Sequence, residues 1–176
     1  MTEAFVLIVC ESGKEDSLIS NLRHISSVSN AFGTFGVYDL IVKLDSADHH
    51  NIQNTISDEI RPIPFVRSTL TLLVEDKGGF VKVHESEQKI LDEHLAQAYI
   101  TIHCPKSQKE DIMDSLKSIA TVTEAYAIIG NYEIICKIAA PTYNDISDII
   151  SNKIRKISGI QSTITSNIIN NQGFEM

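Results

Sequence analysis

The sequence predicts an α+β protein made of two copies of one β-α-β-β-α-β unit. Two observations predict this fold: an internal repeat with a constant offset of 94 residues, and apolar patterns that give the same order of strands and helices in both copies. The repeat is clearest where Gly36-Val37-Tyr38-Asp39-Leu40-Ile41 aligns with Gly130-Asn131-Tyr132-Glu133-Ile134-Ile135. Because a repeat is one structural unit used twice, each copy should make sense as a fold of its own.

Each copy begins with a short apolar run that is typical of a buried strand. In the first copy this run is Phe5 to Cys10, and its counterpart Tyr99 to Cys104 alternates between apolar and polar residues. A polar stretch follows at residues 12–16, where a helix can begin. The apolar stripe of this first helix recurs at helical spacing in both copies: Leu18, Ile19, Leu22 and Ile25, then Ile112, Met113, Leu116 and Ile119.

Two strands joined by a tight turn come next. The pattern predicts strands over Val28–Thr34 and Tyr38–Leu44, with Gly36 in the turn because glycine tolerates a positive φ. Asp45 to Asp48 then provides side-chain oxygens that can cap a second helix.

The second helix and the last strand complete the unit. Ile52, Ile56 and Ile60 recur every four residues and form the helix stripe, and prolines at 62 and 64 end the helix. A strand over Phe65–Val74 follows. This order is the ferredoxin-like arrangement, in which two helices cover one face of an antiparallel sheet.

The opposite face of the first sheet is also apolar, since it carries Phe5, Leu7, Val9 and Ile41. Such a face is expected to be covered. We therefore predict that the two repeats pack sheet to sheet, as an intramolecular dimeric α/β barrel. The predicted domains are 1–76 and 98–176, joined by a linker over 77–97 with a helix near residues 85–97. The polar tail from residue 167 is expected to fray.

Composition narrows the range of functions. The chain has 176 residues, 43% of them apolar and 22% charged, and a formal net charge of −8. Duplex DNA binding depends on Lys and Arg neutralising phosphates, so this balance disfavours direct DNA binding. The chain has no apolar run of about 20 residues and no basic signal-peptide start, which predicts a soluble cytoplasmic protein. Its three cysteines form no CxxC motif and are interpreted as small buried thiols.

No motif of catalysis or metal binding is present. The sequence lacks GxSxG, a Walker loop, GxGxxG and HExxH. Two histidine-containing pairs, His49-His50 and His103-Cys104, fall short of the three or four convergent ligands that zinc usually requires. We therefore expect no metal, no cofactor and no enzymatic activity.

With the repeat parsed, each copy resembles the RAM domain, the amino-acid-sensing regulatory domain of the Lrp/AsnC family of transcription regulators. The features that carry the resemblance are Ala4-Phe5-Val6-Leu7, the stretch from Gly36 to Val42, and Phe65-Val66-Arg67-Ser68-Thr69-Leu70-Thr71. In the second copy they are the stretch from Gly130 to Ile135 and Gly159-Ile160-Gln161-Ser162-Thr163-Ile164-Thr165. Family members usually place a helix-turn-helix before one such domain. Here the first strand begins near Ala4, so we expect no such module.

The resemblance implies a ligand site for amino acids at contacts between domain dimers. It assigns the site to the glycine turn and to the last strand: Gly36, Tyr38, Asp39, Ser68, Thr69, Thr71, Gly130, Tyr132, Glu133, Ser162, Thr163 and Thr165. The chemistry is suitable, because a ligand ammonium needs a carboxylate such as Asp39 or Glu133, and a ligand carboxylate needs N–H groups or hydroxyls. Each of these residues also has a structural interpretation, as a turn glycine, a solvated charge or a strand-forming threonine.

We therefore expect a non-enzymatic regulatory protein that binds an amino acid or similar metabolite. It would form homo-oligomers of the paired repeats, or co-assemble with a full-length DNA-binding relative, and would contact neither nucleic acid nor membrane directly. Two alternatives stay open: a structural or protein-interaction module, and an enzyme of the dimeric α/β-barrel type.

Overall fold

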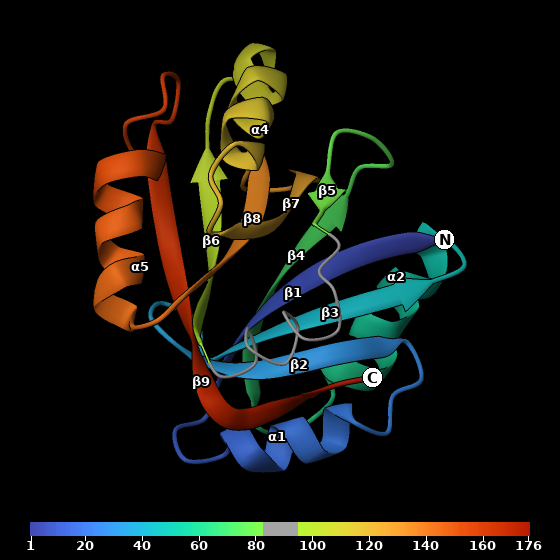
Figure 1. Ribbon diagram of the computed structural model, residues 1–176. Coiled ribbons are helices and arrows are strands. Elements are labelled where there is room, and N and C mark those ends of the chain that lie inside the picture. The colour runs from blue at the N-terminus through green and yellow to red at the C-terminus, as the bar shows by residue number, and fades with distance from the viewer. Residues whose placement is uncertain (83–94) are drawn as a thin grey trace. The chain divides into compact units, whose positions relative to one another are not determined.

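The computed structural model describes residues 1–82 and 95–176 (Figure 1), and the chain divides into two compact units. The first unit contains Met1–Val74 together with the C-terminal segment Ile168–Met176. The second unit contains Glu75–Asn167. Each unit therefore combines most of one repeat with a short segment from the C-terminal end of the other.

The first unit has the predicted β-α-β-β-α-β order, and its sheet runs β4-β1-β3-β2 with β9 added beside β2. Its β1 pairs antiparallel with both β3 and β4. The elements are β1 (Thr2–Cys10), α1 (Glu15–Leu22), β2 (Val28–Phe35), β3 (Leu40–Ser46), α2 (His49–Asn54), the π-helical turn η1 (Thr55–Ile60) and β4 (Val66–Val74).

The second unit repeats this order, and its sheet runs β9-β6-β8-β7 with the short β5 added beside β7. The elements are β5 (Phe80–Val81), β6 (Ala96–His103), the 3₁₀ turn η2 (Lys106–Gln108), α4 (Lys109–Lys117), β7 (Val122–Ile129), β8 (Ile134–Ala140), α5 (Tyr143–Ile149), the π-helical turn η3 (Ile150–Ile154) and β9 (Ser162–Glu175). The predicted fold class, two ferredoxin-like α+β repeats, is confirmed.

Each unit has its own core between its helices and one face of its sheet. The predicted stripes point into these cores: Leu22 and Leu116 on the first helices are fully buried, as are Ile52 and Ile60. Burying one such side chain stabilises a fold by roughly 1.5–3 kcal/mol. The apolar stripes therefore hold the helices on the sheet.

The second helices begin and end alike in the two units. Asp48 caps α2 by accepting a hydrogen bond from the Asn51 N–H, and Thr142 with Asp145 forms a capping box at the start of α5. Each helix then widens into a π-helical turn (η1 or η3), which is followed by an arginine at its C-cap.

The tail does not fray, contrary to the prediction. Strand β9 extends to Glu175, and in the first unit the Met176 N–H donates to the Ser29 carbonyl at 2.9 Å. In the second unit the Lys82 N–H donates to the Thr123 carbonyl, also at 2.9 Å. The two donors differ by the repeat offset of 94 residues, and so do the two acceptors. Residues 75–82 are therefore the counterpart of residues 169–176, although most of them were predicted to belong to the linker. Backbone pairing orders the tail despite its polar side chains.

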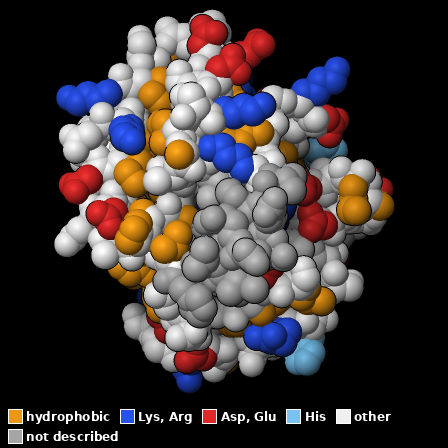
Figure 2. Space-filling view, in the orientation of Figure 1, with side chains coloured by type: hydrophobic (Ala, Val, Ile, Leu, Met, Phe, Trp, Pro, Cys, Tyr) orange, Lys and Arg blue, Asp and Glu red, His pale blue; other side chains and the backbone are white. Residues whose placement is uncertain are grey.

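The predicted linker helix is wrong at its C-terminal end, because Ala96 and Gln97 begin β6 instead. The rest of that prediction, over residues 83–94, lies outside the described residues. No helix in the described part of the chain combines the length and apolarity that a membrane span requires. On the face shown in Figure 2, basic and acidic side chains are interspersed rather than gathered into one basic surface.

Candidate functional site

The turn between the second and third strands of each repeat has the same geometry. Gly36 has φ 146° and Gly130 has φ 148°, a region that only glycine enters easily. The turns are closed by equivalent backbone hydrogen bonds. The Thr34 N–H donates to the Asp39 carbonyl at 2.8 Å, and the Ile128 N–H to the Glu133 carbonyl at 2.9 Å. The turn glycine is therefore a backbone requirement in both copies.

The carboxylate after each turn is bonded to the end of the first strand of its own repeat. Asp39 Oδ2 accepts from the Cys10 N–H at 2.9 Å, and Glu133 Oε2 accepts from the Cys104 N–H at 3.1 Å. Burial, and next the nearby Asp39, raise the pKa of the Cys10 thiol to about 11. Burial and Glu133 likewise raise the pKa of Cys104. We call each pair of carboxylate and strand-end N–H the carboxylate cap.

The second repeat adds a histidine to its carboxylate cap. His103 Nδ1 lies 3.3 Å from Glu133 Oε2, and the His103 ring lies 4.6 Å from the ring of Tyr132. In the first repeat the position of His103 is occupied by Val9. Glu133 therefore has a polar neighbour in His103, whereas the equivalent neighbour of Asp39 is the apolar Val9.

One predicted hydroxyl of the last strand in each repeat accepts a hydrogen bond from an arginine. Arg61 Nε donates to Thr69 Oγ1 at 3.0 Å, and Arg155 Nε donates to Thr163 Oγ1 at 3.0 Å. These bonds tie the arginine after each π-helical turn to the last strand. The remaining predicted hydroxyls stand opposite residues of the neighbouring first strand: Ser68 opposite Val9, Thr71 opposite Val6, Ser162 opposite His103 and Thr165 opposite Ile100.

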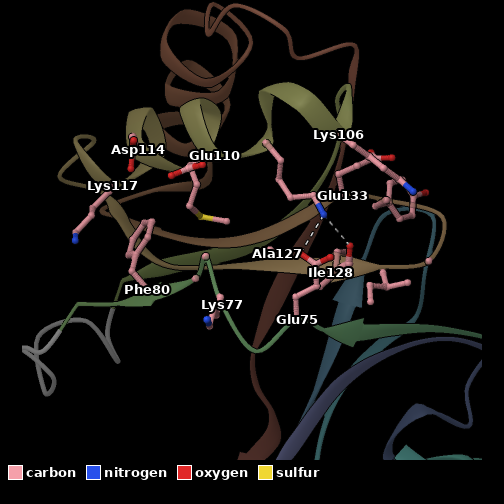
Figure 3. A pocket seen from close by; sticks show the side chains of 17 residues that line it. Glu75, Lys77, Phe80, Lys106, Glu110, Asp114, Lys117, Ala127, Ile128 and Glu133 are labelled. Atoms are coloured by element: carbon pink, nitrogen blue, oxygen red, sulfur yellow. Dashed lines mark hydrogen bonds and ion pairs between the residues drawn. The ribbon is translucent and has the colours of Figure 1, made fainter.

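A cavity of about 730 Å³ opens in the second unit beside the turn. Three of the predicted residues line it, namely Gly130, Tyr132 and Glu133. Ser162, Thr163 and Thr165 are not among the lining residues. One wall is formed by η2 and α4, and another by residues 75–80, which lead into the short strand β5 (Figure 3).

Lys109 is one of the lysines that line this cavity. Its side chain is only 17% exposed, and its Nζ lies 3.2 Å from Glu75 Oε2 and 3.5 Å from the Ile128 carbonyl. Phe80 and Met113 add an apolar surface to the lining. More charges of both signs line the cavity: Lys77, Lys106, Lys117, Glu110 and Asp114.

Sequence reasoning missed the α4 wall and the segment 75–80. Lys106 of η2 and Lys109 of α4 stand where the first repeat has Ser12 and Glu15, so the repeat pattern did not draw attention to them. Within this segment, Lys77-Gly78-Gly79 predicts a flexible break at the start of the linker. Aligning Gly79-Phe80 with Gly173-Phe174 would have shown that the repeat continues there.

Both repeats match the sequence profile of one family, the Lrp/AsnC ligand binding domain, over residues 3–76 and 97–172. The protein belongs to this family, and the resemblance inferred from the sequence is confirmed.

The similarity to characterised proteins covers part of their length. The chain is 32% identical over 71 residues to the HTH-type transcriptional regulator FL11 of Pyrococcus horikoshii, which is 40% of this chain and 46% of that protein. FL11 of Pyrococcus abyssi is 34% identical over 71 residues, which again cover 40% of this chain and 46% of that protein. The chain thus spans about half the length of the curated relatives it matches.

Among solved structures, the fold of the whole chain is found in the siroheme decarboxylase NirDL. The TM-score is 0.73 at 11% identity, covering 98% of this chain and 72% of NirDL. A putative monooxygenase from Lactobacillus acidophilus NCFM gives 0.60 at 4% identity, covering 99% of this chain and 95% of that one. At such identities the likeness concerns the fold alone.

Proposed function

We propose that this protein is a non-enzymatic regulator that binds an amino acid in the cavity of its second unit. The observation that carries the proposal is the composition of that cavity: the family's glycine turn meets a shielded lysine, an acidic residue and an apolar surface in one space of about 730 Å³. Cavities of a few hundred Å³ or more are typical of small-molecule sites.

In this proposal Lys109 holds the ligand's carboxylate. Its ammonium is paired with Glu75, an exchangeable partner whose side chain is 35% exposed. A ligand carboxylate can take the place of Glu75 in a charge-assisted hydrogen bond. Glu133 and Glu110 line the same cavity and offer carboxylates for the ligand's ammonium, while Met113 receives its side chain.

The family supports a regulatory role over an enzymatic one, since the curated relatives are named transcriptional regulators. We propose that the protein acts on transcription through assembly, as a homo-oligomer or with a full-length DNA-binding relative. A ligand can shift such an equilibrium only by binding one assembly state better than another. The enzyme alternative would gain from a histidine inside the cavity, and His103 is not among the lining residues.

The proposal is tested by a thermal-shift screen of the proteinogenic amino acids, followed by calorimetry on those that stabilise. A ligand that binds the native state at 100 times its Kd adds about 2.7 kcal/mol of stability. Lys109→Met removes the proposed carboxylate partner and should weaken binding at least tenfold. Glu15→Met is the matched control, because it changes the equivalent residue of the first unit and should leave the affinity unchanged.

Failure of every amino acid to stabilise the folded protein would overturn the ligand class. Stabilisation by an amino acid that Lys109→Met leaves unaltered would overturn the assigned cavity. A purified protein with a bound coloured cofactor would favour the enzyme alternative instead.

A further inference from the structure

The two units differ most in what lies beside the glycine turn. In the second unit this place is the cavity, and Gly78 on the segment 75–80 lines it opposite Ala127. A Cβ built on Gly78 would stand 3.7 Å from the Ala127 Cβ, which is ordinary contact. The repeat counterparts of this pair are Gln172 and Gly33. The first unit therefore has the long side chain of Gln172 where the second has Gly78. It has Gly33 where the second has Ala127.

Gln172 fills the space that this exchange creates. A Cβ on Gly33 would overlap the side-chain carboxamide of Gln172, so the carboxamide occupies the space that a side chain at position 33 would take. The Gln172 Nε2 donates to Asp16 Oδ1 at 3.0 Å, and Asp16 is the counterpart of Glu110 in the cavity lining. The carboxamide thus lies against the residues whose counterparts form the second unit's cavity.

The Gln172 carboxamide is held by packing and by the backbone around it more than by its own hydrogen bonds. Its Oε1 is buried and accepts no hydrogen bond from the described residues, which is an unfavourable state for a buried acceptor. Phe174, two residues later, is buried and lies under the Arg23 guanidinium at 4.5 Å, and so anchors the same segment. The backbone pairing of β9 and this anchor keep the carboxamide in place although one of its polar atoms is unpaired.

We propose that Gln172 is a built-in plug, which occupies the first unit's counterpart of the ligand cavity and leaves one open site per chain. The inference rests on the proposed function in so far as the second unit's cavity binds a ligand. That Gln172 fills the corresponding space in the first unit can be tested without any amino-acid ligand. Gln172→Gly would restore the residue type that the second unit has at Gly78. The emptied space would then match propionamide, which is the glutamine side chain closed by one hydrogen.

The test is chemical rescue followed by thermal unfolding. Gln172→Gly should melt below the wild type, and propionamide at tens of millimolar should raise its melting temperature by about 2–4 °C, the shift that 1 kcal/mol gives for a chain of this size. The wild type should not respond. Combining Gln172→Gly with Asp16→Ala should abolish the response, because the amide loses its acceptor. Leu22→Ala, an apolar cavity in the same unit, should not respond to propionamide either.

A second readout uses equilibrium dialysis with L-glutamine, which carries the same amide group. In a Glu15→Lys background, which supplies the lysine that the first unit lacks, Gln172→Gly should bind one equivalent more than the chain that keeps Gln172, whatever number that chain binds. If Gln172→Gly does not fold alone, Gln172→Ala replaces it, with the same expected difference. Equal propionamide responses and equal glutamine counts with and without Gln172 would overturn the plug. A wild type that binds no amino acid while the variant is rescued would overturn the proposed function and leave the plug standing.

Discussion

The two units share a framework and differ in what the framework surrounds. Both have the glycine turn, the carboxylate cap, the π-helical turn and the arginine bonded to the last strand. Around these features, the second unit places Lys109 and an open cavity where the first places Glu15 and the Gln172 side chain. The comparison teaches that strand ends and helix ends keep their residues because the backbone needs them, whereas residues around a cavity can diverge.

The largest effect is expected from the helix stripes, which should be equivalent. Leu22→Ala and Leu116→Ala each remove a fully buried side chain and should cost about 2–5 kcal/mol of unfolding free energy. Denaturant unfolding of both variants measures this. A cost below about 1 kcal/mol in one unit alone would break the equivalence of the two cores.

The carboxylate caps should come next. Asp39→Ala and Glu133→Ala each leave a strand-end N–H without its acceptor, which should cost about 1–3 kcal/mol. Asp39→Asn and Glu133→Gln keep an oxygen acceptor and are the matched controls, with smaller losses in the same unfolding experiment. If the alanine and amide variants lost equal stability, charge would matter here more than the hydrogen bond.

A smaller effect is expected from the arginine bonds to the last strand. Thr69→Val and Thr163→Val keep the side-chain shape but remove the acceptor for Arg61 or Arg155, so each should cost about 0.5–1 kcal/mol. Similar losses in the two variants would show that this bond contributes equally to the stability of both units. A ligand affinity that fell only in Thr163→Val would instead move that hydroxyl into the binding site.

The last effect is confined to alkaline pH. Burial raises the pKa of Cys136 from 9.0 to about 12, and burial together with Asp39 raises that of Cys10 to about 11. Between pH 9 and these values the unfolded chain loses thiol protons that the folded chain keeps, so stability should fall as pH rises through that window. Cys136→Ala should flatten the fall in unfolding free energy. An unchanged slope in this variant would show that the Cys136 thiol does not contribute to it.

Particular residues show how far the sequence could be interpreted. The isoleucine stripe at 52, 56 and 60 predicted its helix because periodicity is local, and the glycine turn was found because φ is a property of one residue. The tail was misjudged because its order depends on pairing with β2, a partner more than 100 residues away in the chain. Lys109 was missed because a surface lysine and a cavity lysine look the same in a sequence.

The sequence by itself determined the duplication, the order of strands and helices, the two helix-covered cores and the family, since each follows from short-range patterns that repeat. Only the tertiary structure decided that Asp39 and Glu133 bond to strand-end N–H groups, that Lys109 reaches a cavity, and that Gln172 fills its counterpart. These outcomes depend on which distant segments meet and on the space that a glycine or an alanine leaves. No local sequence pattern encodes the meeting of segments or the space between them.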